Sequence, residues 1–159
     1  MTELMNQSAK TLLIVYHTQS GNTERLAKAV AQGARRIHGI RVRTARAGRV
    51  SAEDLTSCGA LIICSPEYFG YMAGAIKDLF DRTYEEIRDS AAGKSYTVVI
   101  CAGNDGTGAL TSIERIVAGY RLKRVQDPVV CRGGVTESDL ERCRELGQTI
   151  AAGLELGIY

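Results

Sequence analysis

The sequence predicts an α/β fold in which a doubly wound, five-stranded parallel sheet carries helices on both faces. Two observations predict it. Five short apolar segments alternate with five segments of helical period, and the most unusual loops each follow a buried strand. Such alternation is typical of parallel strands joined by right-handed crossovers. At 159 residues the chain is expected to form one domain, residues 1–159, with residues 1–10 as a disordered extension.

The first element is an apolar strand over residues 12–15, whose consecutive aliphatic side chains predict burial on both faces. A small polar loop follows, and then an amphipathic helix over residues 24–37. The loop therefore lies at a helix N-terminus, where N–H groups and the helix dipole attract anions. We expect it to bind a phosphate, with a capped turn that binds nothing as the alternative. Its residues are Thr18, Gln19, Ser20, Gly21, Asn22 and Thr23.

The next elements lead to an aromatic loop. Alternating residues over 40–44 predict a half-exposed edge strand, and Ser51 with Asp54 predicts a capping box for a short helix. Residues 60–64 form a second doubly buried strand. The loop over residues 65–72 then carries three aromatic side chains, which could lie against a flat ligand. Capping of the core or a subunit contact is the alternative.

The remaining chain continues the alternation. Its expected elements are a helix over 74–87, a strand over 96–101, a glycine-rich loop over 102–108, a helix over 110–120, a strand over 124–131 and a closing helix over 136–154. Thr136 with Asp139 predicts a cap for the closing helix. Pro128 lacks an N–H group, which favours a sheet edge for the last strand. The three unusual loops, over 18–23, 65–72 and 102–108, all follow strands. They are therefore expected to meet beyond the carboxyl ends of the sheet, where such folds bind ligands.

Two segments resemble a known family. Residues Thr18–Thr23 match the TxTGNT-type phosphate loop of flavodoxins. Residues Ser65–Thr83 are similar to the SPxYFGxMxGxxKxFxDRT segment of flavodoxin-like NAD(P)H:quinone oxidoreductases and NADPH-dependent FMN reductases. The resemblance implies the strand order 2-1-3-4-5 and FMN as cofactor. It also implies a homo-oligomer, a dimer or tetramer, in which a neighbouring subunit helps to cover the aromatic loop.

The resemblance assigns a role to each loop. The first loop would hold the FMN phosphate. The flavin ring would lie against two groups of residues, which are Pro66, Glu67, Tyr68, Phe69 and Gly70 in the second loop and Ala102, Gly103, Asn104, Asp105 and Gly106 in the third. Tyr71 and Met72 would border the substrate side. No catalytic side chain and no metal is expected, because the flavin carries the chemistry.

The predicted function is an FMN-binding oxidoreductase that takes hydride from NAD(P)H and passes electrons to a quinone or similar acceptor. The chain has no tryptophan and a pI near 8.3, unlike acidic electron-carrier flavodoxins, which favours a reductase. One alternative is a flavodoxin-type electron-transfer protein that serves a redox protein and has no NAD(P)H activity of its own. Another is a non-redox interaction module with the same fold.

Composition limits the other classes of function. Net charge is +2, and no aromatic residue lies within the arginine-rich stretch of residues 35–49, which argues against nucleic-acid binding. Those arginines form either a solvated edge or a surface that attracts an anionic cosubstrate such as NADPH. Without an apolar run of membrane-spanning length or a signal peptide, the protein is expected in the cytoplasm. The five cysteines contain no CxxC, and Cys64 and Cys101 are interpreted as buried packing thiols, with a redox role as the alternative.

Overall fold

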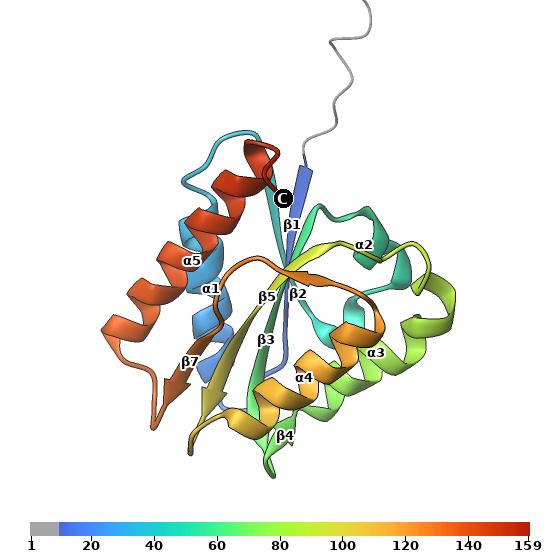
Figure 1. The fold of residues 1–159 in the computed structure, drawn as a ribbon. Helices are drawn as coiled ribbons and strands as arrows, with labels where there is room; N and C mark the ends of the chain where they lie inside the picture. Colours follow the sequence, from blue (N-terminus) through green and yellow to red (C-terminus); the bar gives the residue numbers. More distant parts are fainter. Residues whose placement is uncertain (1–9) are drawn as a thin grey trace, which may run out of the picture.

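The computed structural model describes residues 10–159 as a parallel sheet between two layers of helices (Figure 1). The main strands are β1 (Lys10–Tyr16), β2 (Ile40–Arg46), β3 (Ala60–Tyr68), β5 (Ser95–Ala102) and β7 (Val129–Arg132). They pair in the order β2-β1-β3-β5-β7, all parallel. The predicted order 2-1-3-4-5 is therefore confirmed. Lys10 begins β1 and is not part of an extension, and the rest of the predicted extension lies outside the described residues.

Helices cover both faces of the sheet. Figure 1 shows α1 (Asn22–Ala34) and α5 (Glu137–Glu155) together on one face, with α2 (Ala52–Ser57), α3 (Gly74–Ile87) and α4 (Thr107–Gly119) on the other. A short 3-10 turn, η2 (Ala47–Arg49), joins β2 to α2. The predicted capping boxes at Ser51 and Thr136 are both present, because each needs only hydrogen bonds within four residues. No helix among residues 10–159 has the length and apolar character that a membrane span requires.

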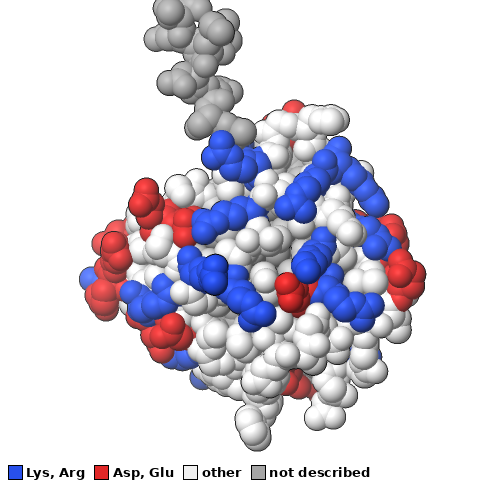
Figure 2. Space-filling view, turned by 180° about the vertical axis from the view of Figure 1, so that it is seen from behind, with Lys and Arg blue, Asp and Glu red and all other residues white. Residues whose placement is uncertain are grey.

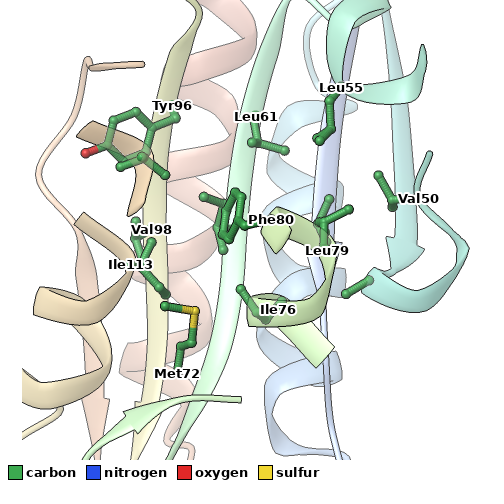
Figure 3. Packing of buried hydrophobic residues seen from close by; sticks show 14 of the residues in the cluster. Val50, Leu55, Leu61, Met72, Ile76, Leu79, Phe80, Tyr96, Val98 and Ile113 are labelled. Atoms are coloured by element: carbon green, nitrogen blue, oxygen red, sulfur yellow. The ribbon is translucent and has the colours of Figure 1, made fainter. Parts of the chain in front are cut away.

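Two apolar cores result, one on each face of the sheet. In β1, Leu13 and Val15 face one core while Leu12 and Ile14 face the other, as expected for a doubly buried strand. Figure 3 shows the first core, in which Phe80 from α3 packs among side chains of the sheet and of α4. Because the main strands are parallel, their carboxyl ends and the loops that follow them lie at the same edge of the sheet.

The last predicted strand differs from the structure. Instead of one strand over 124–131, two short strands pair with β5, namely β6 (Lys123–Arg124) and β7. Between them the chain leaves the ladder, and the Thr97 hydroxyl donates to the carbonyl of Gln126 (2.9 Å). Pro128 has no N–H to offer β5, which explains the break at an otherwise apolar segment.

Candidate functional site

A cavity of about 260 Å³ opens at the carboxyl ends of the strands. It is built from the loop after β1, the end of β3, the loop after β5 and the turn after β7. The lining residues are Thr18, Gln19, Ser20, Asn22, Thr23, Pro66, Glu67, Tyr68, Cys101, Ala102, Gly103, Gly133 and Gly134. The three loops singled out in the sequence therefore do converge, and a fourth segment joins them.

The loop after β1 leaves the N-terminus of α1 without a side-chain cap. Its N-cap residue is Gly21, whose φ of 95° is in the left-handed region that favours glycine. The Thr18 hydroxyl closes the loop by accepting from the Gly21 N–H (2.8 Å). In contrast, α2 and α5 both carry complete capping boxes. The positive end of α1 is thus presented to the cavity, beside the hydroxyl-bearing residues of the loop.

The predicted loop over residues 65–72 is instead a β-hairpin. β3 continues to Tyr68 and pairs antiparallel with β4 (Tyr71–Met72). The two turn residues, Phe69 and Gly70, have φ values of 53° and 68°, as a type I′ turn requires. Phe69 is fully exposed, at 107% of its reference area, and only Tyr68 of the three aromatic residues lines the cavity.

Hairpin register separates residues that are neighbours in sequence. Tyr68 lies opposite Tyr71, whereas Glu67 lies opposite Met72, so the two pairs point to opposite faces. Met72 is 2% exposed and belongs to the core beside α4, where its N–H donates to the Ser112 hydroxyl (3.1 Å). The Met72 side chain is therefore packed in the core, and its place on the substrate side stays a prediction. Tyr71 is 43% exposed and remains accessible.

Phe69 occupies a strained backbone position, because residues other than glycine, asparagine and aspartate rarely adopt positive φ. Phe69→Asn is expected to raise the free energy of unfolding by up to about 1 kcal/mol. Chemical denaturation of the cofactor-free protein measures this change. Tyr71→Asn, at an exposed strand position, is the matched control and should not stabilise. A lower stability of the Phe69→Asn variant would contradict the prediction and indicate that contacts of the Phe69 ring stabilise the protein.

The hairpin is clamped to the N-terminus of α4. The Glu67 carboxylate accepts from the Ala109 N–H (3.0 Å), so this side chain caps α4 while also lining the cavity. A Cβ on Gly108 would lie 1.9 Å from the Gly70 carbonyl oxygen, so only glycine allows this approach. In addition, the buried Ser65 hydroxyl accepts from the Ala73 N–H (3.0 Å) at the start of α3. The wall that carries Tyr68 is consequently held by both neighbouring helices.

The loop after β5 contributes only in part. Ala102 and Gly103 line the cavity, whereas Asn104, Asp105 and Gly106 lie beyond its lining. The Asp105 carboxylate accepts from the Thr107 N–H (2.9 Å), and this backbone hydrogen bond lowers the pKa of the carboxyl group. Asp105 thus shapes the turn that begins α4. Gly21, Phe69 and Gly70 also stand outside the lining of the cavity.

Sequence reasoning missed the turn after β7. Gly133 and Gly134 line the cavity, and the Gly133 N–H donates to the Ala102 carbonyl (2.9 Å). Both have positive φ, at 71° and 116°. The signal was a glycine pair directly after a strand predicted for the same sheet. Because loops that follow parallel strands meet at the carboxyl edge of the sheet, this glycine pair could have been placed there with the other three loops.

The cysteines near the cavity are poor nucleophiles. Burial raises the pKa of the Cys101 thiol, and the fully buried Cys64 has its pKa raised far above the usual range for the same reason. Thiolate is the reactive form, so both side chains are held in the unreactive state. The pKa of His17 is lowered, first by burial of its ring and then by the nearby Arg46 charge. Its ring meets the Tyr68 ring edge-on, with centroids 6.1 Å apart.

Comparison with known proteins identifies the family and the fold. A family model described as flavodoxin matches residues 14–147, from β1 into α5. The chain belongs to the flavodoxin family. It is 27% identical over 156 residues to a flavodoxin of Aquifex aeolicus (strain VF5), a match that spans 88% of this chain and 84% of that protein. Membership of the flavodoxin family implies FMN as the cofactor.

Two further comparisons qualify this result. A solved flavodoxin from the domain Archaea matches with a TM-score of 0.78 at 21% identity, covering 91% of this chain and 99% of that one, a likeness of fold. An NAD(P)H dehydrogenase (quinone) of Acidithiobacillus ferrooxidans is 29% identical over 92 residues. That match covers 45% of this flavodoxin-family chain and 46% of the relative, so the chain spans less than half of the length of that dehydrogenase.

Proposed function

We propose that this chain binds FMN in the cavity and works as an electron carrier between redox partners. The observation that carries the proposal is the uncapped N-terminus of α1, which opens onto a cavity that the Tyr68 side chain also lines. A phosphate needs N–H and hydroxyl donors, and a planar ring needs a flat wall; this site offers both. The family match supports the same assignment.

The residues present fit FMN in their chemistry. Thr18, Ser20 and Thr23 would donate hydroxyl hydrogen bonds to the phosphate, alongside the N–H groups that begin α1. None of the lining residues in the described chain is Lys or Arg, so the phosphate charge would be met by dipoles. Tyr68 and the backbone at Ala102 and Gly103 would hold the ring. FMN, when bound, supplies the reversible uptake of electrons.

The electron carrier is preferred to the NAD(P)H oxidoreductase predicted from the sequence. The flavodoxin of Aquifex aeolicus aligns over most of both chains, whereas the quinone dehydrogenase aligns over less than half of either. The reductase remains the second candidate because that partial match exists and because residues Ser65–Thr83 resemble quinone reductases. A quinone-like acceptor, the cytoplasmic location, the single domain and the homo-oligomer all stay predictions from the sequence.

An anaerobic titration distinguishes the candidates. The protein is loaded with FMN, and the visible flavin absorption is followed as NADPH, NADH or dithionite is added. We expect dithionite to bleach the absorption promptly and both nicotinamides to act slowly without another protein. Rapid bleaching by NADPH or NADH would replace the electron carrier with the reductase. Failure to bind FMN would reject both and favour the non-redox interaction module.

A further inference from the structure

The edge of the sheet formed by β2 is strongly basic. β2 pairs only with β1 among the described strands, so its other side faces solvent. Arginine occupies four positions along this edge and the turn after it, and Figure 2 shows Lys and Arg gathered over one face of the molecule. We call this region the β2 basic face; its residues are Arg41, Arg43, Arg46 and Arg49.

The positive charge of this face is only partly neutralised. Arg43 pairs with Asp54 at 2.5 Å. Within residues 10–159, by contrast, Arg41 and Arg49 form no ion pair or side-chain hydrogen bond, and both are exposed. A hollow of about 420 Å³ lies over the face, lined by Tyr16, Thr44, Ala45 and three of the arginines. An excess of positive charge therefore borders a concave surface.

The backbone of the turn that carries Arg49 is fixed, and Arg46 adjoins the cofactor cavity. The Arg82 guanidinium donates to the carbonyls of Ala47 and Val50, both at 2.6 Å, which fixes the turn that carries Arg49. Arg46 lies 5.6 Å over the Tyr16 ring and donates to the Thr18 carbonyl (3.5 Å). Because Thr18 also lines the cavity, a molecule bound on this face would lie next to the proposed FMN.

The spread of the charges indicates the size of the partner. The seven residues of β2 extend over roughly 20 Å at about 3.3 Å per residue, which is wider than one phosphate group. Arg43 and Arg46 already have partners within the chain, and Arg41 lies outside the hollow that the other three arginines line, so the charges are spread more widely than a site for a small anion requires. A row of separated positive charges instead matches a row of carboxylates on a protein surface.

We propose that the β2 basic face docks an acidic redox protein, so that the partner's redox centre approaches the cofactor cavity. This inference rests on the proposed electron-carrier function. In the transfer step, one electron leaves the reduced protein and lowers the oxidation state of the partner's haem or iron–sulfur centre by one. No atom is transferred. Charge complementarity raises the association rate and weakens with salt, which makes the docking measurable.

The experiment compares two charge-reversed variants of the full chain. Arg41→Glu/Arg49→Glu alters the face, and Arg115→Glu/Lys123→Glu alters exposed positions on α4 and β6 as a matched control. Each variant changes the net charge from +2 to −2, because each substitution removes two units of charge. Ferric cytochrome b5 serves as an acidic probe and ferric cytochrome c as a basic one. Calorimetry measures binding to the cofactor-free protein and, separately, to the FMN-loaded protein.

We expect wild-type protein to bind cytochrome b5 better than cytochrome c, and to do so more weakly as salt is raised. Arg41→Glu/Arg49→Glu should reduce the affinity for cytochrome b5 by about tenfold or more, whereas Arg115→Glu/Lys123→Glu should reduce it by less than about threefold. Stopped-flow reduction of cytochrome b5 by dithionite-reduced, FMN-loaded protein should slow in the same order. Circular dichroism checks folding, with Arg41→Gln/Arg49→Gln as the milder variant if the reversal unfolds.

Three outcomes would overturn the proposal. The first is an equal loss of cytochrome b5 affinity in both variants, which would indicate an effect of net charge alone. The second is stronger binding of cytochrome c than of cytochrome b5. The third is tight binding of 2′-phospho-AMP or of a short DNA duplex that Arg41→Glu/Arg49→Glu abolishes. The last would assign the face to a nucleotide or nucleic acid. If the chain does not bind FMN, the proposed function fails, yet binding of cytochrome b5 to the cofactor-free protein still tests the face. The two failures are therefore distinguishable.

Discussion

Asn22→Asp is expected to weaken FMN binding by roughly 100-fold without destabilising the cofactor-free protein. Asn22 is the first residue of α1 and lines the cavity. If the proposed phosphate site is right, the substitution places a carboxylate beside a phosphate. Two unit charges at about 4 Å repel by about 4 kcal/mol at an effective dielectric constant near 20, and screening leaves about 3 kcal/mol, equivalent to roughly 100-fold.

Stability should change in the opposite direction. A negative charge in the first turn of a helix interacts favourably with the helix dipole, by about 0.3–1 kcal/mol. The N-cap residue of α1 is Gly21, which has no side chain, so the new carboxylate displaces no N-cap hydrogen bond. The variant should therefore bind FMN poorly while unfolding at the same or a higher denaturant concentration. General loss of structure cannot produce this combination.

Fluorescence quenching titrations with FMN and with riboflavin measure the effect. Riboflavin lacks the phosphate, so its affinity should change by less than about threefold if the repulsion is with the phosphate. Gln148→Glu introduces the same charge on the exposed side of α5, where Gln148 accepts from Arg36, and is the control. Equal weakening of FMN and riboflavin would contradict a phosphate site at this loop, as would an unchanged FMN affinity.

Gly147→Ala is expected to lower the free energy of unfolding by about 3 kcal/mol, a large part of the 5–15 kcal/mol typical of a domain. Helices α1 and α5 approach so closely that a Cβ on Gly147 would lie 1.9 Å from the Val30 carbonyl oxygen. Gly33 makes the reciprocal contact, 1.7 Å from the Arg144 carbonyl oxygen. Backbone atoms cannot rotate away as a side chain can, so the helices must separate and loosen the core beneath them.

Denaturant unfolding followed by far-UV circular dichroism tests this prediction. Gly119→Ala is the matched control, because Gly119 ends α4 and a Cβ there meets no atom within 4 Å. The control should be neutral or slightly stabilising, since alanine has the higher helix propensity. A loss below about 1 kcal/mol for Gly147→Ala would show that the two helices can separate without cost to the core.

Features set by local interactions could be predicted from the sequence. The capping boxes of Ser51 and Thr136 were found from residue types three positions apart, and the structure contains both. The burial of β1 on both faces follows from its consecutive aliphatic residues, and the edge position of β2 from its alternation. The cavity edge was also predictable, because every parallel strand ends on the same side of the sheet.

Features that depend on distant segments could not be predicted in this way. The hairpin of β3 and β4 packs against α4. An N–H group in the first turn of α4 donates to the Glu67 carboxylate, and Gly108 allows the Gly70 backbone to approach closely. That register turns Met72 into the core and leaves Phe69 exposed, although both belong to one aromatic segment in the sequence.

By itself, the sequence determined the order of elements, the two-sided burial of the central strands and the position of the binding edge, because periodicity and capping act over a few residues. Only the tertiary structure decided which side chains of residues 65–72 face the cavity, that Gly133 and Gly134 line it, and that Arg46 of β2 adjoins it at Thr18. These depend on pairing register and on packing between segments far apart in the chain, which residue types alone do not specify.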